Sequence, residues 1–141
     1  MTNKFHLAIP VHNLKIAEEF YVTKLNCTTG RKTKEWCDLN FFGHQLTLHL
    51  KPEETNIIST NNVEECAVPV RHFGIILTMN DWDDLAKKLA AAKTSFIIRP
   101  HIRFKGQTGE QATMFFLDPS SNALEFKAFA DQSQVFAAYI D

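Results

Sequence analysis

The residues best suited to chemistry in this 141-residue sequence are histidines and a carboxylate that recur in two halves of the chain. The opening segments of the halves, FHLAIPV and RHFGIIL, are similar, and an offset of 66 residues aligns His6 with His72. Later in each half, His49 and Glu125 lie in the last strand-like segment, LHL in one half and LEF in the other. Imidazole nitrogens and carboxylate oxygens bind divalent transition metals. A duplicated unit that carries these four residues predicts a pseudo-symmetric metal site.

The elements that must position these residues follow the same order in both halves. Alternating apolar residues indicate half-buried strands, and apolar residues spaced by three or four indicate amphipathic helices. The predicted strands are 5–11, 27–32, 34–42, 45–51, 71–78, 95–99, 111–118 and 122–129, and the predicted helices are 13–25 and 81–92. The polar stretch 52–68 is typical of a linker, and Asn80 has a side chain suited to capping the second helix. We therefore expect an α+β protein of two βαβββ modules.

The alternation of side chains along a strand places the four candidate ligands on one side of the sheet. In the first strand, three apolar residues share the side that suits packing against a helix, so His6 faces the other side. The same alternation turns His49, His72 and Glu125 away from the helices. A single strand histidine is more often a structural residue with a hydrogen-bond partner than a metal ligand. The agreement of two copies in register favours one concave metal site.

Five further residues are candidates for binding a substrate beside this site. Trp36 lies in the third strand, Gln111, Thr113 and Phe115 alternate along the seventh, and Arg103 precedes a glycine-containing loop. An aromatic wall, an amide and a guanidinium suit a small oxygen-rich organic molecule with an anionic group. The alternative for Trp36 and Phe115 is that they fill the core.

The composition excludes several classes of partner. The net charge is −1 and no basic run exceeds two residues, so the chain has no electrostatic footprint for nucleic acid or an anionic membrane. No apolar run reaches the length of a transmembrane helix, and the start does not resemble a signal peptide. Three cysteines without a CxxC spacing indicate free thiols in a reducing compartment. We expect one cytoplasmic domain over residues 1–141 that acts on a small molecule.

Several segments resemble the vicinal-oxygen-chelate superfamily, which includes glyoxalases, extradiol dioxygenases, fosfomycin-modifying enzymes and bleomycin-resistance proteins. The resemblance rests on HLAIPVHNL from residue 6 with the following Phe20-Tyr21, on His72-Phe73-Gly74, and on FFLDPSSNALE ending at Glu125. It implies a glyoxalase-like fold, in which paired βαβββ modules form a cup-shaped mixed sheet around a divalent metal, with the helices on the convex face. The modules would span 4–68 and 69–130, followed by a C-terminal tail at 131–141.

The resemblance also implies which residues bind the metal. His6, His72 and Glu125 match ligand positions of the superfamily, whereas His49 stands where relatives of the lactoylglutathione-lyase type usually carry Glu or Gln. An imidazole-rich set argues against Mg²⁺ and Ca²⁺ and leaves Fe²⁺, Mn²⁺, Ni²⁺, Co²⁺ or Zn²⁺ as the candidate cofactor.

Two reactions fit the predicted site, and they differ in the role of His49. With His49 as a fourth ligand, about two coordination positions stay open, which suits lyase or isomerase chemistry in which Glu125 moves a proton. With His49 set back as an acid or base, His6, His72 and Glu125 form the two-histidine, one-carboxylate face of non-haem Fe(II) oxygenases. We favour the oxygenase-like interpretation. The alternative class is a metal-free small-molecule binding protein of the bleomycin-resistance type.

The predicted assembly is a homodimer, because half-cups with open sheet edges can be closed by a second copy. The site would then lie within one chain or between two. The apolar C-terminal residues either cover that junction or pack back on their own module; they are Phe136, Ala137, Ala138, Tyr139 and Ile140.

Overall fold

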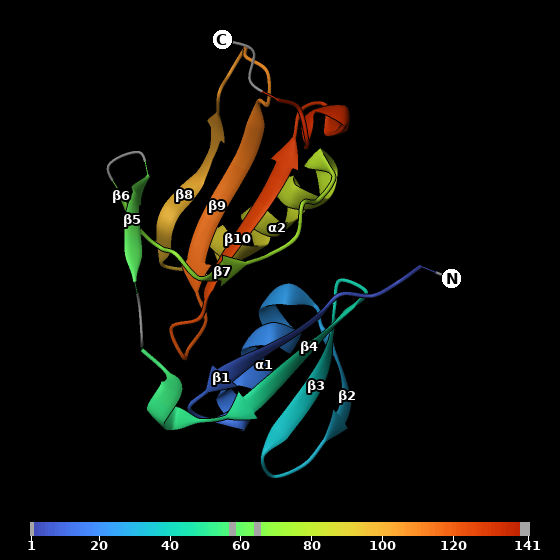
Figure 1. Cartoon of the computed structure of the whole chain (residues 1–141), viewed down its shortest axis with the longest axis vertical. Helices are drawn as coiled ribbons and strands as arrows, with labels where there is room; N and C mark the ends of the chain where they lie inside the picture. Colours follow the sequence, from blue (N-terminus) through green and yellow to red (C-terminus); the bar gives the residue numbers. More distant parts are fainter. Residues whose placement is uncertain (1, 57–58, 64–65, 139–141) are drawn as a thin grey trace. The chain divides into compact units, whose positions relative to one another are not determined.

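Two compact units make up the chain in a computed structural model that describes residues 2–56, 59–63 and 66–138 (Figure 1). One unit is Met1–Ser59 together with Asp118–Asn122, and the other is Thr60–Leu117 together with Ala123–Asp141. Each unit has one α-helix and its own four-stranded mixed sheet. This confirms the predicted α+β fold of two βαβββ modules. Among the described residues, no helix has both the length and the apolar character needed to cross a membrane.

The first unit follows the predicted element order. Its elements are β1 (His6–Val11), α1 (Leu14–Leu25), β2 (Thr28–Lys32), β3 (Trp36–Phe41) and β4 (His44–Leu50). The strand order in the sheet is β1-β4-β3-β2, with β1 parallel to β4 and the other neighbours antiparallel. The Asn13 side chain caps α1 by accepting a hydrogen bond from the Ile16 amide, and Asn26 ends the helix in a left-handed conformation.

The second unit repeats this order after an additional hairpin. Its elements are β5 (Thr60–Val63), β6 (Cys66–Pro69), β7 (His72–Phe73), α2 (Met79–Ala91), β8 (Phe96–Arg103), β9 (Gln111–Leu117) and β10 (Ala123–Phe129). The main sheet has the order β7-β10-β9-β8, with β7 parallel to β10. In Figure 1, α2 lies behind the sheet formed by β8, β9 and β10. The Trp82 indole on α2 donates a hydrogen bond of 2.9 Å to the Phe126 carbonyl, which anchors the helix to β10. Two short 3-10 helices, η1 (Pro52–Glu54) and η2 (Gln132–Gln134), complete the chain.

Three sequence predictions about this region are corrected by the structure. The expected linker 52–68 contains the β5–β6 hairpin, with residues 57–58 and 64–65 outside the described part of the chain. The expected strand 71–78 is only two residues long, followed by an isolated bridge between Ile76 and Lys127. The cap of α2 is Thr78, whose side chain accepts a hydrogen bond from the Asp81 amide, and not Asn80. Of the apolar C-terminal residues, Tyr139 and Ile140 lie outside the described residues.

The faces of both sheets agree with the predicted alternation. On the helix side, Val11, Leu48, Leu124 and Phe126 are fully buried. The candidate ligands lie at the alternate positions of the same strands, where His6 is exposed and Glu125 is half-buried. One side of each sheet therefore builds the core, and the other carries the polar residues.

A turn from the second half of the sequence, Asp118–Asn122, packs as part of the first unit. The Asp118 carboxylate is buried and accepts hydrogen bonds from the Tyr21 hydroxyl at 2.7 Å and from the Ser120 and Asn122 amides. Burial raises the pKa of Asp118, although these hydrogen bonds oppose the shift. The Ser120 hydroxyl contacts the His12 ring nitrogen Nδ1 at 2.7 Å. The turn Asp118–Asn122 thus holds together segments that are far apart in the sequence.

Candidate metal centre

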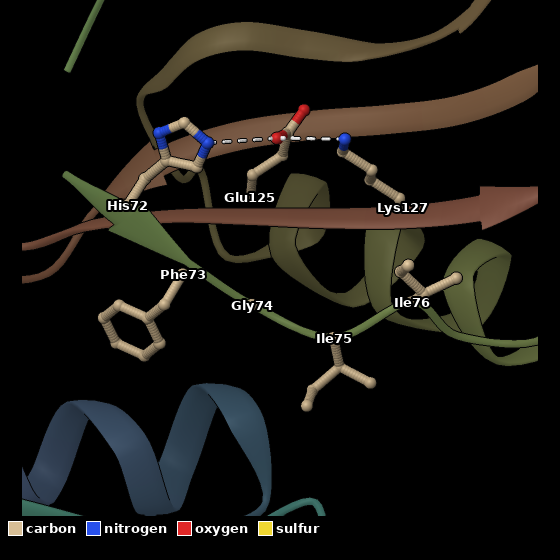
Figure 2. A pocket seen from close by; sticks show the side chains of 7 residues that line it. All are labelled: His72, Phe73, Gly74, Ile75, Ile76, Glu125 and Lys127. Carbon is tan, nitrogen blue, oxygen red and sulfur yellow. Dashed lines mark ion pairs between the residues drawn. The ribbon is translucent and has the colours of Figure 1, made fainter. Parts of the chain in front are cut away.

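His72 and Glu125 lie side by side because β7 and β10 run parallel. The register pairs His72 with Ala123, so that Glu125 follows two residues further on the same face of β10. The distance between His72 Nε2 and Glu125 Oε1 is 3.5 Å. Figure 2 shows both side chains on one side of β7, with Phe73 and Ile75 directed to the other. The structure therefore brings together two of the four predicted ligands.

Each of these two side chains is held in place by a further hydrogen bond. His72 Nδ1 lies 2.8 Å from the Pro69 carbonyl, and the His72 ring contacts Phe115 edge-on with centroids 4.8 Å apart. The Thr113 hydroxyl donates a 2.7 Å hydrogen bond to Glu125 Oε2. Such outer contacts fix the ring orientation of a ligand histidine and the position of a ligand carboxylate.

The hydrogen bonds of His72 determine what its other nitrogen can do. A carbonyl oxygen only accepts, so Nδ1 carries the hydrogen, and in a neutral imidazole Nε2 is then an acceptor. This nitrogen faces Glu125 Oε1, which is also an acceptor when ionised. Two facing acceptors repel unless a cation lies between them, either a proton on the imidazole or a metal ion. The donor set and its orientation therefore fit a divalent transition metal.

Gly74 permits the close approach of the two strands. A Cβ atom at this position would overlap the Glu125 carbonyl, with the carbonyl carbon only 2.7 Å away. Real Cβ atoms essentially never come within 3.0 Å of such neighbours. The absence of a side chain at Gly74 thus lets the chain that follows β7 run close beside β10 at the predicted ligand.

A cavity of about 200 Å³ opens at this pair of residues. Its lining residues, drawn in Figure 2, are His72, Phe73, Gly74, Ile75, Ile76, Glu125 and Lys127. The Lys127 ammonium lies 3.7 Å from Glu125 Oε1, and its side chain is one-third exposed. Lys127 lies two residues after Glu125 in β10 and shares its face, but it is not among the residues predicted from the sequence. The sequence feature that could have identified Lys127 as a site residue is its positive charge, two residues after the candidate ligand Glu125.

The first unit places its two candidate histidines differently from the prediction. His6 is paired with Gln45 along β1 and β4, and His49 is paired with Pro10. In the second unit, Glu125 lies two residues after Ala123, the partner of His72. In the first unit, the residue two positions after Gln45, the partner of His6, is Thr47. The prediction that His49 is the counterpart of Glu125 is therefore wrong. Both His6 and His49 are exposed and share the open face of their sheet.

Thr47 is engaged with a buried carboxylate. Its hydroxyl donates a 2.6 Å hydrogen bond to Asp38 Oδ1, and the Gln45 amide nitrogen lies 3.3 Å from Asp38 Oδ2. Asp38 is only 9% exposed. Sequence analysis did not identify this polar cluster, although Asp38, Gln45 and Thr47 all alternate onto the open face of the sheet.

The predicted substrate-binding residues have several environments. Phe115 is buried in a small core cluster with Val68 and Ile98. Thr113 is buried against Glu125, whereas Gln111 is buried and its Oε1 atom has no hydrogen-bond partner among the described residues. The remaining two, Trp36 and Arg103, are half-buried; the Arg31 guanidinium lies 5.9 Å from the Trp36 ring, and Arg103 contacts Phe104.

No three His, Cys, Asp or Glu residues within the described ranges converge as a complete metal site. The second unit supplies a pair of candidate ligands, and the first unit carries two exposed histidines. The roles of His6 and His49 as ligands stay predictions.

These observations define a class of protein: a duplicated βαβββ protein in which a histidine on β7 and a glutamate on β10 have side chains of the types that bind metals. The chain matches the family model described as Glyoxalase/Bleomycin resistance protein/Dioxygenase superfamily over residues 5–126. It is 36% identical to a glyoxalase/bleomycin resistance protein/dioxygenase from Alicyclobacillus acidocaldarius, with 95% of this chain and 96% of that chain covered and a TM-score of 0.78. The chain therefore belongs to the glyoxalase/bleomycin resistance protein/dioxygenase superfamily.

More distant solved structures share the fold. The fosfomycin resistance protein FosX from Listeria monocytogenes is 12% identical, with 96% of this chain and 99% of that chain covered and a TM-score of 0.70. Lactoylglutathione lyase from Agrobacterium tumefaciens is 17% identical, with 98% of each chain covered and a TM-score of 0.67. None of the curated proteins is significantly similar in sequence.

Proposed function

We propose that this protein is a divalent-metal-dependent enzyme that acts on a small oxygen-rich organic substrate. The observation that carries the proposal is the pair of facing acceptors, His72 Nε2 and Glu125 Oε1, 3.5 Å apart. Both side chains are held from behind, by the Pro69 carbonyl and the Thr113 hydroxyl. Such support is typical of metal ligands, since it fixes the free lone pairs toward a common point. The cofactor in this proposal is Fe²⁺, Mn²⁺, Ni²⁺, Co²⁺ or Zn²⁺.

The oxygenase-like reaction is favoured over the lyase or isomerase reaction. A four-ligand site needs a metal-binding side chain at the position equivalent to Glu125. That position is Thr47, whose hydroxyl donates a hydrogen bond to Asp38. With His6 as the proposed third ligand, the set is two histidines and one carboxylate. A bound metal would polarise substrate oxygens and, as Fe²⁺, offer a position for dioxygen.

The chain's own residues would then orient the substrate and move its proton. Glu125 is 11% exposed at its side chain, so its carboxylate is shielded but reachable from the cavity. His49 is exposed on the open face of its sheet and is the proposed acid or base. Within the described part of the chain, the buried Gln111 Oε1 atom has no hydrogen-bond partner, and it would suit a hydroxyl donor of the substrate.

A metal-free binding protein is the competing function. The observation in its favour is Lys127, whose ammonium lies 3.7 Å from Glu125 Oε1 and supplies a positive charge without a metal. The site would then bind an anionic small molecule and catalyse no reaction.

We further propose a cytoplasmic homodimer. The cysteines of the chain, Cys27, Cys37 and Cys66, are free thiols, which suits a reducing compartment. Among the described residues, each four-stranded sheet has an open edge at both ends, at β1 and β2 in one unit and at β7 and β8 in the other, and a second copy can cover such edges. Light scattering at micromolar concentration tests the assembly, and a monomer with an intact metal site would contradict it.

Metal analysis tests the proposed function. Protein purified without a chelator or a metal-affinity tag, then reconstituted and desalted, should retain about one equivalent of a transition metal. Glu125→Gln should lose it, while the exposed Glu35→Gln serves as the matched control. Less than about a tenth of an equivalent in the parent protein, with no uptake on reconstitution, would favour the metal-free binder.

A further inference from the structure

Glu125 has two oxygens with different environments. Oε2 accepts the Thr113 hydrogen bond, while Oε1 faces both His72 Nε2 at 3.5 Å and Lys127 Nζ at 3.7 Å. Oε1 is therefore the oxygen available to a metal, and a lysine ammonium already lies beside it. Both cations compete for the same lone pairs.

Lys127 is held by hydrogen bonds at its backbone, whereas its long side chain is partly exposed. Its amide donates to the Ile75 carbonyl at 3.2 Å, and its carbonyl accepts from the Leu77 amide at 2.7 Å. The side chain is one-third exposed and lines the cavity. The ammonium can thus swing away from Glu125 without any movement of β10.

The surroundings of Lys127 suit an anion. Along the open face of the sheet, the register pairs Lys127 with Thr113 and Thr113 with His101, and Arg103 pairs with Gln111 in the next row. Basic side chains and the Thr113 hydroxyl therefore lie in neighbouring rows of this face, close to the Glu125 carboxylate. When a divalent cation binds Glu125, the net charge of this face becomes more positive.

We propose that Lys127 is an exchangeable counter-ion, which neutralises Glu125 in the metal-free protein and binds an anionic group of the substrate when the metal is present. The substrate would then be an oxygen-rich molecule that carries a carboxylate or phosphate close to its metal-binding oxygens. This inference rests on the proposed function, because it requires a metal at Glu125. It makes anion binding depend on prior metal binding.

Two titrations with opposite expected signs test the proposal. Lys127→Met removes the competing charge, so Mn²⁺ should bind about tenfold more tightly than to the parent protein. Inorganic phosphate should bind the Mn²⁺-loaded variant about tenfold more weakly, since its cationic partner is lost. Lys127→Arg keeps the charge and should resemble the parent in both titrations. Lys87→Met, on the surface of α2 and paired with Asp83, is the matched control.

The outcomes separate this inference from the function on which it rests. Calorimetry that finds no Mn²⁺ binding to the parent protein would overturn the proposed function and the inference together. Mn²⁺ binding that Lys127→Met leaves unchanged or weakens would overturn the inference alone. Phosphate binding of equal strength to the metal-loaded parent and Lys127→Met proteins would also overturn it.

Discussion

Gly74→Ala should separate β7 from β10 at the predicted metal centre. The added Cβ would overlap the Glu125 carbonyl, whose carbon lies 2.7 Å away, and the neighbour is backbone that cannot rotate aside. Strand β7 must therefore move away from β10 by on the order of 1 Å. It pairs with β10 through only two residues and one bridge, so the strand can shift while the core of the sheet stays intact.

The retreat moves His72 away from Glu125 and should weaken metal binding. Metal–ligand distances must lie within about 0.2 Å of their ideal values. Changes in the residues that hold the ligands in place reduce metal affinity about 10–100-fold. Calorimetric titration of Zn²⁺ into the variant measures the loss. Gly30→Ala is the matched control, because its Cβ meets Asp38 Cβ at an ordinary 3.4 Å. An unchanged affinity in Gly74→Ala, with the fold intact by circular dichroism, would refute the close-approach argument.

Three other perturbations have defined outcomes. Tyr21→Phe removes the 2.7 Å hydrogen bond to buried Asp118 and should lower the free energy of unfolding by about 1.5–3 kcal/mol; a loss below about 0.5 kcal/mol in urea denaturation would contradict this. Burial raises the pKa of the Cys27 thiol from 9.0 to about 12, so the thiol favours the folded state below pH 9 and this contribution is lost as the pH rises toward 12. The urea midpoint of Cys27→Ala should therefore fall less steeply between pH 8 and pH 10.5 than that of the parent, and parallel curves would exclude the thiol as a cause. His49→Ala should keep its metal content and slow turnover by roughly 10²–10⁴-fold; loss of metal would make His49 a ligand, and a normal rate with normal metal content would remove both roles.

The sequence predicts the order of elements well because the core side of each strand alternates cleanly. Leu48 and Leu124 mark the helix side of their strands, and both are fully buried. The β5–β6 hairpin was missed because its first strand reads Thr60-Asn61-Asn62-Val63 and is mostly exposed. Among its described residues, the hairpin is buried at two adjacent positions, Val68 and Pro69, so it gives little periodic signal.

Register was the main limit on predicting the site. The β3–β4 turn has two residues, Phe42 and Gly43, whereas five residues join β9 to β10. The similar segments LHL and LEF, and not the strand pairing, aligned His49 with Glu125. The parallel pairing with β1 sets the register instead and puts Thr47 at that place. His72 and Glu125 were found because both follow directly from alternation within their own strands.

The proposed function requires that His72 Nε2 and Glu125 Oε1 bind one divalent metal ion. Anomalous diffraction from crystals grown with Zn²⁺ tests it directly, since the peak locates the ion independently of any activity. A single strong peak is expected at roughly 2.0–2.2 Å from both atoms. No peak at this pair of residues, or a peak that lies on other side chains, would contradict metal binding by His72 and Glu125.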